Sequence, residues 1–356
     1  MAKPESIATT LGERIGVPGI VPGMKVAAER FGTRDWADYF GPAIDAAEHG
    51  FPIYSFLYGE AAAASERLGY YPETRATWMP AGFIQPAGDL FVQKKLAETL
   101  RTLAQRGSDY FIRGGWAERF VSGVNQTGER ISLEEVAGYE SVWVDPVEFS
   151  YRGVDFRGDP PASLGGTLNG MVFNILEHVD LREMGHYTDS AEALDVIRKA
   201  FDLATDQTHR FVSNPKTAQV PARTLIFKEL GALYAALIRE SGPVGDIMPR
   251  RDALTAVGAG SARRELNTDT THLTIVDEDG NWVSMAHTVY GDTFGTGLTV
   301  DRVFVNSGNT FPGTGASEGR RVITLFPAVM ALDAAGRPWL SLGSPGLSTW
   351  AAATTK

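Results

Sequence analysis

One stretch of this chain constrains its fold more than any other: a threonine-rich start, a strand-like run and a tight turn. Residues 270–277 are rich in Thr, Ile and Val, which favour β-strands, and Glu278-Asp279-Gly280-Asn281 follows with turn-forming residues. Residues 282–289 repeat the strand pattern. The sequence therefore predicts an antiparallel hairpin whose first residue is Thr270.

Two registers are open to this hairpin. A two-residue Asp279-Gly280 loop would pair His272 with His287, and two facing imidazoles would form half of a metal site. A three-residue loop, with Gly280 left-handed in a bulge, would instead pair Thr270 with Thr288 and bring a second hydroxyl beside the first. We expect the second register and no metal, because the other four histidines show no ligand spacing and catalytic zinc usually has three protein ligands.

The segment before Thr270 is suited to backbone cleavage. Residues 257–269 are small and polar, so they are expected to form an exposed loop. A cut between Asp269 and Thr270 would leave Thr270 with a free α-amine. An amine with a pKa near neutrality can take the proton of the attacking hydroxyl, so one residue would supply both nucleophile and base. The alternative is an ordinary surface linker that is never cut.

Composition excludes several classes of function. The chain has 356 residues, 43% of them hydrophobic, which suits a substantial core, and its net charge of −10 argues against nucleic-acid or anionic-membrane partners. It has no cysteine, so disulfides and thiolate chemistry are excluded. Residues 293–297 form a glycine-permitted bend that lacks the Lys-Ser/Thr ending of a phosphate loop, and no cofactor is expected.

The sequence carries no apolar run of the ~20 residues that span a bilayer, and its start does not resemble a secretion signal. We expect a cytoplasmic protein if this start is genuine, and a periplasmic or secreted one if the true start is missing.

Periodicity divides the chain into a helix-rich part and a later β-rich part. Ser132 and Glu135 fit a capping box at a short helix. Longer helices are expected over 36–48, 94–106, 160–179, 190–204 and 223–240. Strands are expected over 141–147, 149–156, 271–277, 282–289, 303–306, 326–333 and 339–342.

The run from Thr270 to Asn281 resembles the small-subunit start of the γ-glutamyltranspeptidase family, whose members are N-terminal-nucleophile hydrolases that cleave themselves before this threonine. The likeness continues through further motifs at residues 16–19, 42–44, 151–153, 160–166, 293–297 and 343–346. It implies an α/β fold, a four-layer αββα sandwich. It also implies a large-subunit portion at 1–269 and a small-subunit portion at 270–356.

The resemblance also implies roles for individual residues. Thr270 would be the nucleophile, Thr288 the hydroxyl that positions it, and the amides of Gly346 and Leu347 the oxyanion donors. Positions that would contact the substrate are Tyr290, Asn309, Thr324 and Ser344. The expected partners are a small amide or peptide donor, water or an amine acceptor, and the two fragments of the same chain.

Departures from the family concern the donor. Its γ-glutamyl head group is normally held by charged and polar residues, but here Tyr290, the 309–312 stretch and Ile323-Thr324 stand at those places. A desolvated charged head group needs paired charges, and several of them are replaced here by uncharged or apolar residues. The expected donor is therefore either γ-glutamyl or another acyl amide, such as those cut by cephalosporin-acylase-like relatives. Two interpretations of Arg320 and Arg321 are open: a site that binds a carboxylate from a new direction, or a solvated loop, which is the commoner role of an Arg pair in a segment rich in Gly and Ser. The chain starts and stops short of the family's usual ends, and we expect an incomplete reading frame.

Overall fold

The computed structural model describes residues 15–216, 218–241, 270–289, 293–307, 323–324 and 326–344. The chain forms two compact units, and each contains sequence from both sides of residue 270. Unit 1 comprises Met1–Trp143 and Val289–Thr310, and unit 2 comprises Val144–Thr288 and Phe311–Lys356. The predicted portions 1–269 and 270–356 do not coincide with these packing units.

Unit 1 is mainly helical. Its elements are α2 (Ile20–Phe31), η1 (Trp36–Phe40), α3 (Gly41–His49), β1 (Phe51–Pro52), α4 (Ser55–Ala63), α5 (Ser65–Tyr70), α6 (Pro72–Trp78), β2 (Leu90–Phe91), α7 (Lys94–Arg106), α8 (Asp109–Ile112), α9 (Gly115–Asn125), α10 (Leu133–Ala137), β7 (Thr299–Val300) and β8 (Val303–Phe304). Two short antiparallel pairs, β1–β2 and β7–β8, complete it. Helix α7 has the predicted bounds.

The capping box at Ser132 is confirmed. Its hydroxyl accepts from Glu135 N at 3.1 Å, and the Glu135 carboxylate accepts from Ser132 N at 2.7 Å. These hydrogen bonds lower the Glu135 pKa. The predicted helix over 36–48 is instead a 3₁₀ turn followed by α3, which begins at Gly41-Pro42.

Unit 2 combines a four-stranded sheet, a separate hairpin and five helices among its described residues. Its elements are β3 (Val147–Tyr151), β4 (Val154–Gly158), α11 (Gly165–Leu176), α12 (Leu181–Met184), α13 (Ala191–Phe211), α14 (Ala222–Leu225), α15 (Lys228–Glu240), β5 (Thr271–Val276), β6 (Trp282–His287), β9 (Val329–Leu332) and β10 (Pro338–Leu342). The sheet has the antiparallel order β10-β9-β4-β3. None of the described helices is long and apolar enough to span a bilayer.

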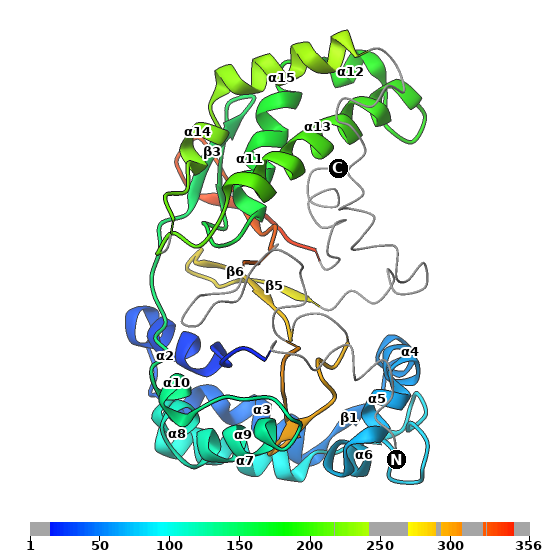
Figure 1. The fold of residues 1–356 in the computed structure, drawn as a ribbon, viewed down its shortest axis with the longest axis vertical. Helices are drawn as coiled ribbons and strands as arrows, with labels where there is room; N and C mark the ends of the chain where they lie inside the picture. Colours follow the sequence, from blue (N-terminus) through cyan, green and yellow to red (C-terminus); the bar gives the residue numbers. More distant parts are fainter. Residues whose placement is uncertain are drawn as a thin grey trace. The chain divides into compact units, whose positions relative to one another are not determined.

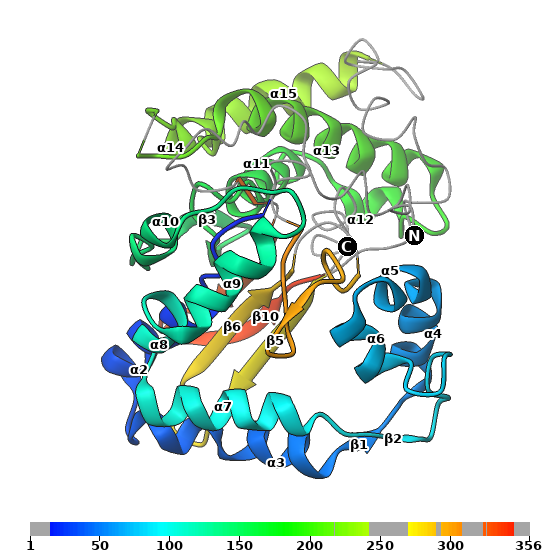
Figure 2. The same cartoon turned by 60° about the horizontal axis from the view of Figure 1, so that its bottom comes forward.

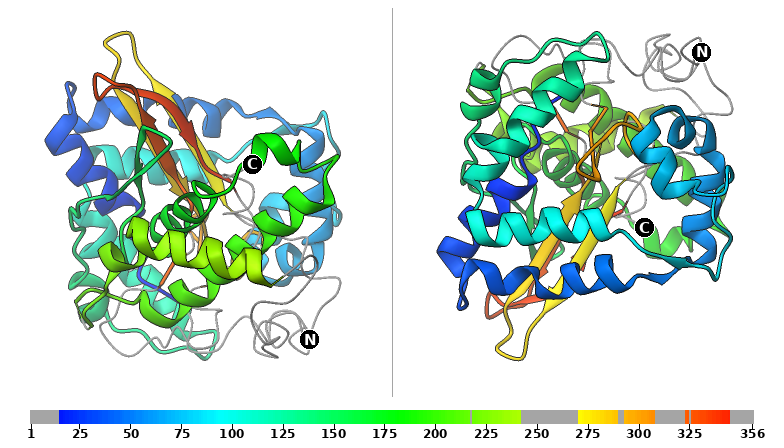
Figure 3. Two further views of the ribbon diagram at one scale, coloured as in Figure 1. Left: turned by 90° about the horizontal axis from the view of Figure 1, so that it is seen from above. Right: turned by 90° about the horizontal axis from the view of Figure 1, so that it is seen from below.

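Helix α11 is the centre of unit 2, and all twelve of its residues are buried. On one side it packs on β3 and β4, where Phe173 stacks with Phe149 and Phe156 at ring-centroid distances of 5.8 and 5.1 Å. On the other side it packs on α13 and α15 (Figure 1). Strand β10 runs alongside the β5–β6 hairpin (Figures 2 and 3).

Glycines allow the close approach at the start of α11. A Cβ on Gly165 would lie 1.7 Å from the carbonyl oxygen of Phe326, and one on Gly166 would lie 2.2 Å from that of Asp159. No side chain fits in those gaps. The Gly165-Gly166 pair therefore lets the helix begin against the strand end and the 326–328 segment.

The strand predictions over 141–156 were partly wrong. Residues 141–146 form no strand, and the run predicted over 149–156 is split by a turn at Arg152-Gly153. Both turn residues have positive φ, 49° and 81°, as in the tight hairpin turns that match strand twist. The sequence did not reveal the turn, because the apolar pattern continues across it and Arg is unusual in a left-handed conformation.

Candidate active site

The β5–β6 hairpin has the register that sets two threonines opposite each other. Thr271 pairs with His287 and Val276 with Trp282, and continuing that register by one residue places Thr270 opposite Thr288. Gly280 has φ of 80°, as expected for the left-handed position of a three-residue loop. The predicted register is confirmed, and the two-residue loop is excluded.

Asp277 holds the turn that fixes this register. Its carboxylate accepts from Asp279 N at 3.0 Å, Asn281 N at 2.8 Å and Asn281 Nδ2 at 2.8 Å. These hydrogen bonds, led by the one from the Asn281 side chain, lower the Asp277 pKa. Gly280 N also donates to Asp277 O at 3.2 Å. The loop is thus closed by its own residues, and a slip of one residue would break these bonds.

His272 does not face His287. It pairs with Ala286, and its Nε2 lies 2.9 Å from Ser284 Oγ. Burial lowers its pKa, so the imidazole is neutral near pH 7. Within the described ranges no three His, Asp or Glu side chains are placed to hold a metal ion.

Strand β10, which precedes the predicted oxyanion turn at 343–346, contacts strand β5. Thr274 Oγ1 donates to Ser341 Oγ at 3.1 Å, which links β5 to β10. Two residues further along each strand, Gly343 lies against the ring of His272. His272 is two residues from Thr270, and Gly343 immediately precedes Ser344 in the predicted oxyanion turn. The packing contact between Gly343 and His272 therefore lies two residues from the nucleophile candidate.

Thr324, a predicted substrate-contacting residue, is tied to the turn that opens α11. Its backbone N donates to Ala162 O at 3.0 Å, and its carbonyl accepts from Leu164 N at 2.8 Å. This arrangement is a parallel bridge between Thr324 and Ser163. The family-like motif at 160–166 thus positions the segment that carries Thr324.

Five of the predicted site residues lie outside the described residues: Asp269, Tyr290, Asn309, Gly346 and Leu347. The predicted cleavage loop at 257–269 and the pair Arg320-Arg321 also lie outside them. The described residues of the predicted site are Thr270, Thr288, Thr324 and Ser344, and all four belong to unit 2.

Sequence reasoning missed Asp159, which follows β4 and precedes the Pro160-Pro161 turn. Its carboxylate accepts a hydrogen bond from Ala328 N, while its Oδ2 is inaccessible to solvent and has no hydrogen-bond partner among the described residues. Burial raises its pKa to about 7. An Asp at a strand end just before two prolines is the only local signal, and it does not predict burial.

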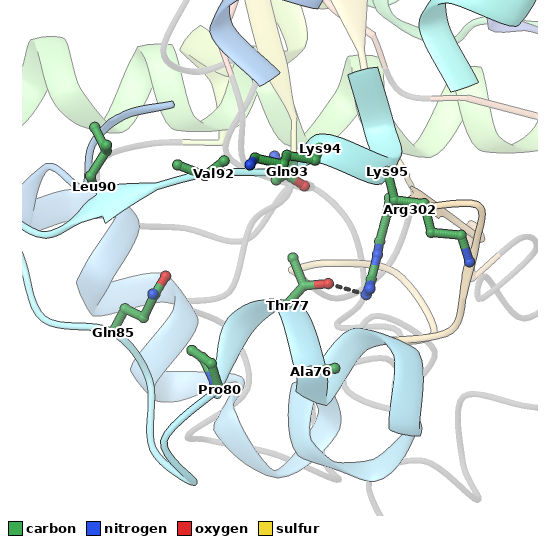
Figure 4. Close-up of a pocket in the computed structure, with 10 residues that line it drawn as sticks. All are labelled: Ala76, Thr77, Pro80, Gln85, Leu90, Val92, Gln93, Lys94, Lys95 and Arg302. Atoms are coloured by element: carbon green, nitrogen blue, oxygen red, sulfur yellow. Dashed lines mark hydrogen bonds between the residues drawn. The ribbon is translucent and has the colours of Figure 1, made fainter. Parts of the chain in front are cut away.

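A separate cavity of about 450 Å³ lies in unit 1, beside α6, β2 and the start of α7 (Figure 4). It is lined by Thr77, Gln93, Lys94, Lys95 and Arg302 among others. The Glu73 carboxylate pairs with both Lys95 and Arg302, at 3.4 and 3.6 Å. None of the described residues of the predicted site lines this cavity.

Comparison with known proteins places the chain in one family. The model of the family described as gamma-glutamyltranspeptidase matches residues 1–356. The glutathione hydrolase proenzyme of Escherichia coli is 28% identical over 351 residues, which cover 93% of this chain and 58% of that protein. The Acylase ACY 1 proenzyme of Pseudomonas sp. strain SE83 is 30% identical over 340 residues, with the same coverage of 93% and 58%. The chain spans about three-fifths of the length of these relatives.

Solved structures agree on the fold. A cephalosporin acylase from Bacillus halodurans aligns with a TM-score of 0.73 at 22% identity, over 94% of this chain and 62% of that one. The γ-glutamyltranspeptidase of Helicobacter pylori aligns with a TM-score of 0.62 at 28% identity, over 67% and 68%. The fold is thus α/β, of the N-terminal-nucleophile hydrolase type that the sequence predicts, and the chain belongs to the γ-glutamyltranspeptidase family.

Proposed function

We propose that this protein is a self-processing threonine amidohydrolase or acyltransferase. Cleavage between Asp269 and Thr270 would produce fragments 1–269 and 270–356 and free the Thr270 amine. The observation that carries the proposal is the hairpin register, because it sets the Thr288 hydroxyl opposite Thr270 at the start of β5. A hydroxyl there can hydrogen bond to the nucleophile and hold it in one orientation.

The reaction would proceed in two acyl transfers. The Thr270 amine accepts the hydroxyl proton as Thr270 Oγ bonds to the acyl carbon, and the amide C–N bond breaks as the leaving nitrogen takes that proton. Water or an amine then attacks the ester, giving up its own proton, and Thr270 Oγ is released and reprotonated. The amides of Gly346 and Leu347 would hold each oxyanion, a role in which losing one donor typically costs ~3 kcal/mol.

The donor is an acyl amide, and two classes are in view. Relatives include both glutathione hydrolase and acylase proenzymes, so family membership alone favours neither. The uncharged side chains of Tyr290 and Thr324, at places that hold the charged head group elsewhere in the family, favour a donor without a free α-amino acid group. A non-γ-glutamyl acyl amide is therefore the class of donor that these positions favour, and Ser344 and Asn309 are the polar contacts left for it.

Denaturing electrophoresis tests the catalyst. The purified protein is expected to give two bands, with Thr270 as the first residue of the small one by N-terminal sequencing. Thr270→Ala is expected to stay whole. Thr271→Ala is the matched control: Thr271 is the adjacent residue and is exposed, so its variant should still be cut. A folded wild type that gives one uncut band would support an unprocessed, non-catalytic homologue instead.

A further inference from the structure

We propose that residues 293–307, which we call the latch segment, hold the C-terminal fragment on the N-terminal fragment after cleavage. The inference rests on the proposed cut before Thr270. The latch segment follows that cut in sequence, yet it packs within unit 1, whose other described residues are 15–143 and Val289. Once the backbone is cut, these contacts join two separate chains, in addition to the β4–β9 pairing within unit 2.

Apolar residues of the latch segment complete both cores of unit 1. Phe294 and Phe304 pack on Trp78, with ring centroids 4.7 and 6.2 Å away. Val300 and Val305 are 6% and 1% exposed and lie in the second core, which contains Trp116. Loss of the segment would expose both cores to water, so the hydrophobic effect opposes separation of the fragments.

Buried polar groups also depend on the latch segment. Thr74, which is fully buried, donates from Oγ1 to Gly297 O at 2.7 Å. Thr99 Oγ1 donates to Asp301 O at 2.9 Å. Separation would leave the buried Thr74 hydroxyl without its partner Gly297 O, and an unpaired buried polar group is costly. Thr99 would keep its hydrogen bond to Lys95 O at 3.0 Å.

A further contact reaches the first described residues of the chain. Gly16 N donates to Asn306 Oδ1 at 2.9 Å, and Asn306 Nδ2 donates to Gly16 O at 2.8 Å. The amide side chain thus pairs with the backbone in the two-sided manner of a β-ladder. This contact ties the far end of the latch segment to the N-terminal fragment.

The β7–β8 turn consists of Asp301 and Arg302, two residues that do not favour its backbone conformation but whose side chains make further contacts with the N-terminal fragment. Asp301 and Arg302 have φ of 50° and 68°, a conformation that favours Asn-Gly in two-residue hairpin turns. Each side chain reaches the N-terminal fragment instead. Asp301 Oδ2 accepts from Arg119 Nε at 2.7 Å, and the Arg302 guanidinium donates to Thr77 Oγ1 and to the Glu73 carbonyl (Figure 4). Strained backbone persists where the surroundings fix it, and here three contacting groups do so.

A replacement of Asp301-Arg302 by Asn-Gly separates the two explanations of this turn. The Asn-Gly variant relaxes the backbone and removes both ionic contacts. If the turn were only a local chain reversal, the small fragment would be held as tightly as in the wild type, or more tightly. If it is part of the latch, the small fragment should be released about tenfold faster or more during a wash in moderate urea, a factor equal to ~1.4 kcal/mol.

The measurement uses an affinity tag on the N-terminal fragment and gel detection of the small fragment that remains bound. Arg337→Ala is the matched control, because Arg337 pairs with Asp333 inside the small fragment and is exposed, so retention should not change. Equal retention of the wild type and the Asn-Gly variant would overturn the latch.

Cleavage and retention are read separately, so the two proposals fail in different ways. An uncut wild-type band counts against the proposed function alone. In that case the uncut Thr270→Ala protein still reports on the latch, because the Asn-Gly variant should lower the urea midpoint of the intrinsic tryptophan fluorescence, to which the buried Trp78 and Trp116 contribute. An unchanged midpoint there, with Arg337→Ala as reference, would count against the latch.

Discussion

Gly343 lies so close to His272 that no other residue fits at this position. A Cβ on Gly343 would lie 2.2 Å from His272 Cδ2 and 2.4 Å from its Cγ, well inside contact distance. The imidazole is held in turn by Ser284. The glycine thus sets how near the end of β10 approaches β5, and with it the start of the predicted oxyanion turn.

We expect Gly343→Ala to slow both self-cleavage and amide hydrolysis, because the added methyl group must push the turn away from β5. His272→Ala removes the ring and opens space for it. The double variant should therefore recover part of the activity lost in Gly343→Ala, as a double-mutant cycle would show. Equal losses in the single and double variants would mean that the contact does not position the turn.

Thr288→Val keeps the size and the β-branch of the side chain but removes the hydroxyl opposite Thr270. We expect a decrease of about fivefold or more in the rate of cleavage and of acyl transfer, since one hydrogen bond contributes ~1 kcal/mol or more. Thr288→Ser should retain most of the rate. Thr271→Val, on the other face of the hairpin, is the control for lost hydroxyls, and an equal effect there would contradict the positioning role.

Gly280→Ala tests how the register is fixed. No atom lies within 4 Å of the added Cβ, so the variant adds only the backbone cost of φ near 80°, about 1 kcal/mol. Thermal unfolding should show that loss, together with a smaller cleaved fraction. Gly280→Asn should lose less, because Asn tolerates the left-handed region. Identical behaviour of the two variants would argue against a left-handed turn.

Asp159 predicts an unusual pH dependence of stability. Its pKa is about 7 when folded and 3.8 when unfolded, so the folded state holds the proton longer. The free energy of unfolding should fall as pH rises from about 4 to about 7, by ~4 kcal/mol at most. Asp159→Asn should remove that fall. The free energy of unfolding of the variant, relative to that of the wild type, should therefore increase as the pH rises. Urea titrations at pH 5 and pH 8 measure this difference. Asp155→Asn is the control, because Asp155 is exposed and lies in β4, the strand that precedes Asp159.

We predict that donor choice follows from Tyr290 and Pro312, at positions where the family resemblance implies polar or charged groups. We expect a γ-glutamyl anilide to be turned over more slowly than a glutaryl-type or uncharged acyl anilide, compared as kcat/KM. The Thr270→Ala protein gives the background rate. Efficient hydrolysis of glutathione would contradict this prediction.

The features that could be predicted from the sequence are those that neighbouring residues determine. The hairpin register follows from the turn at Gly280 and from alternation over a few residues, so it could be predicted from residues 270–289 alone. The same reasoning missed the β3–β4 turn, where Arg152 occupies a left-handed position that Asn or Gly normally takes.

Long-range packing was beyond that reasoning. The burial of Asp159 depends on residues near Ala328, which are far away along the chain, and no local pattern reports such a contact. Likewise, the bend at 293–297 was predicted only as a turn, although Thr293 accepts from Arg67 and donates to Glu60 in unit 1. The family resemblance supplied the candidate roles, and the structure supplied their neighbours.

Unit 1 combines two distant stretches of sequence, so its cores cannot be completed until the second stretch has been synthesised. Both cores around Trp78 and Trp116 lack Phe294, Phe304 and Val305 until those residues leave the ribosome. At ~5–20 residues per second, that is roughly 8 to 30 s after residue 143 has been made. During this interval the aromatic side chains around Trp78 and Trp116 lack the residues that cover them in the finished protein, and transiently exposed apolar surface favours aggregation.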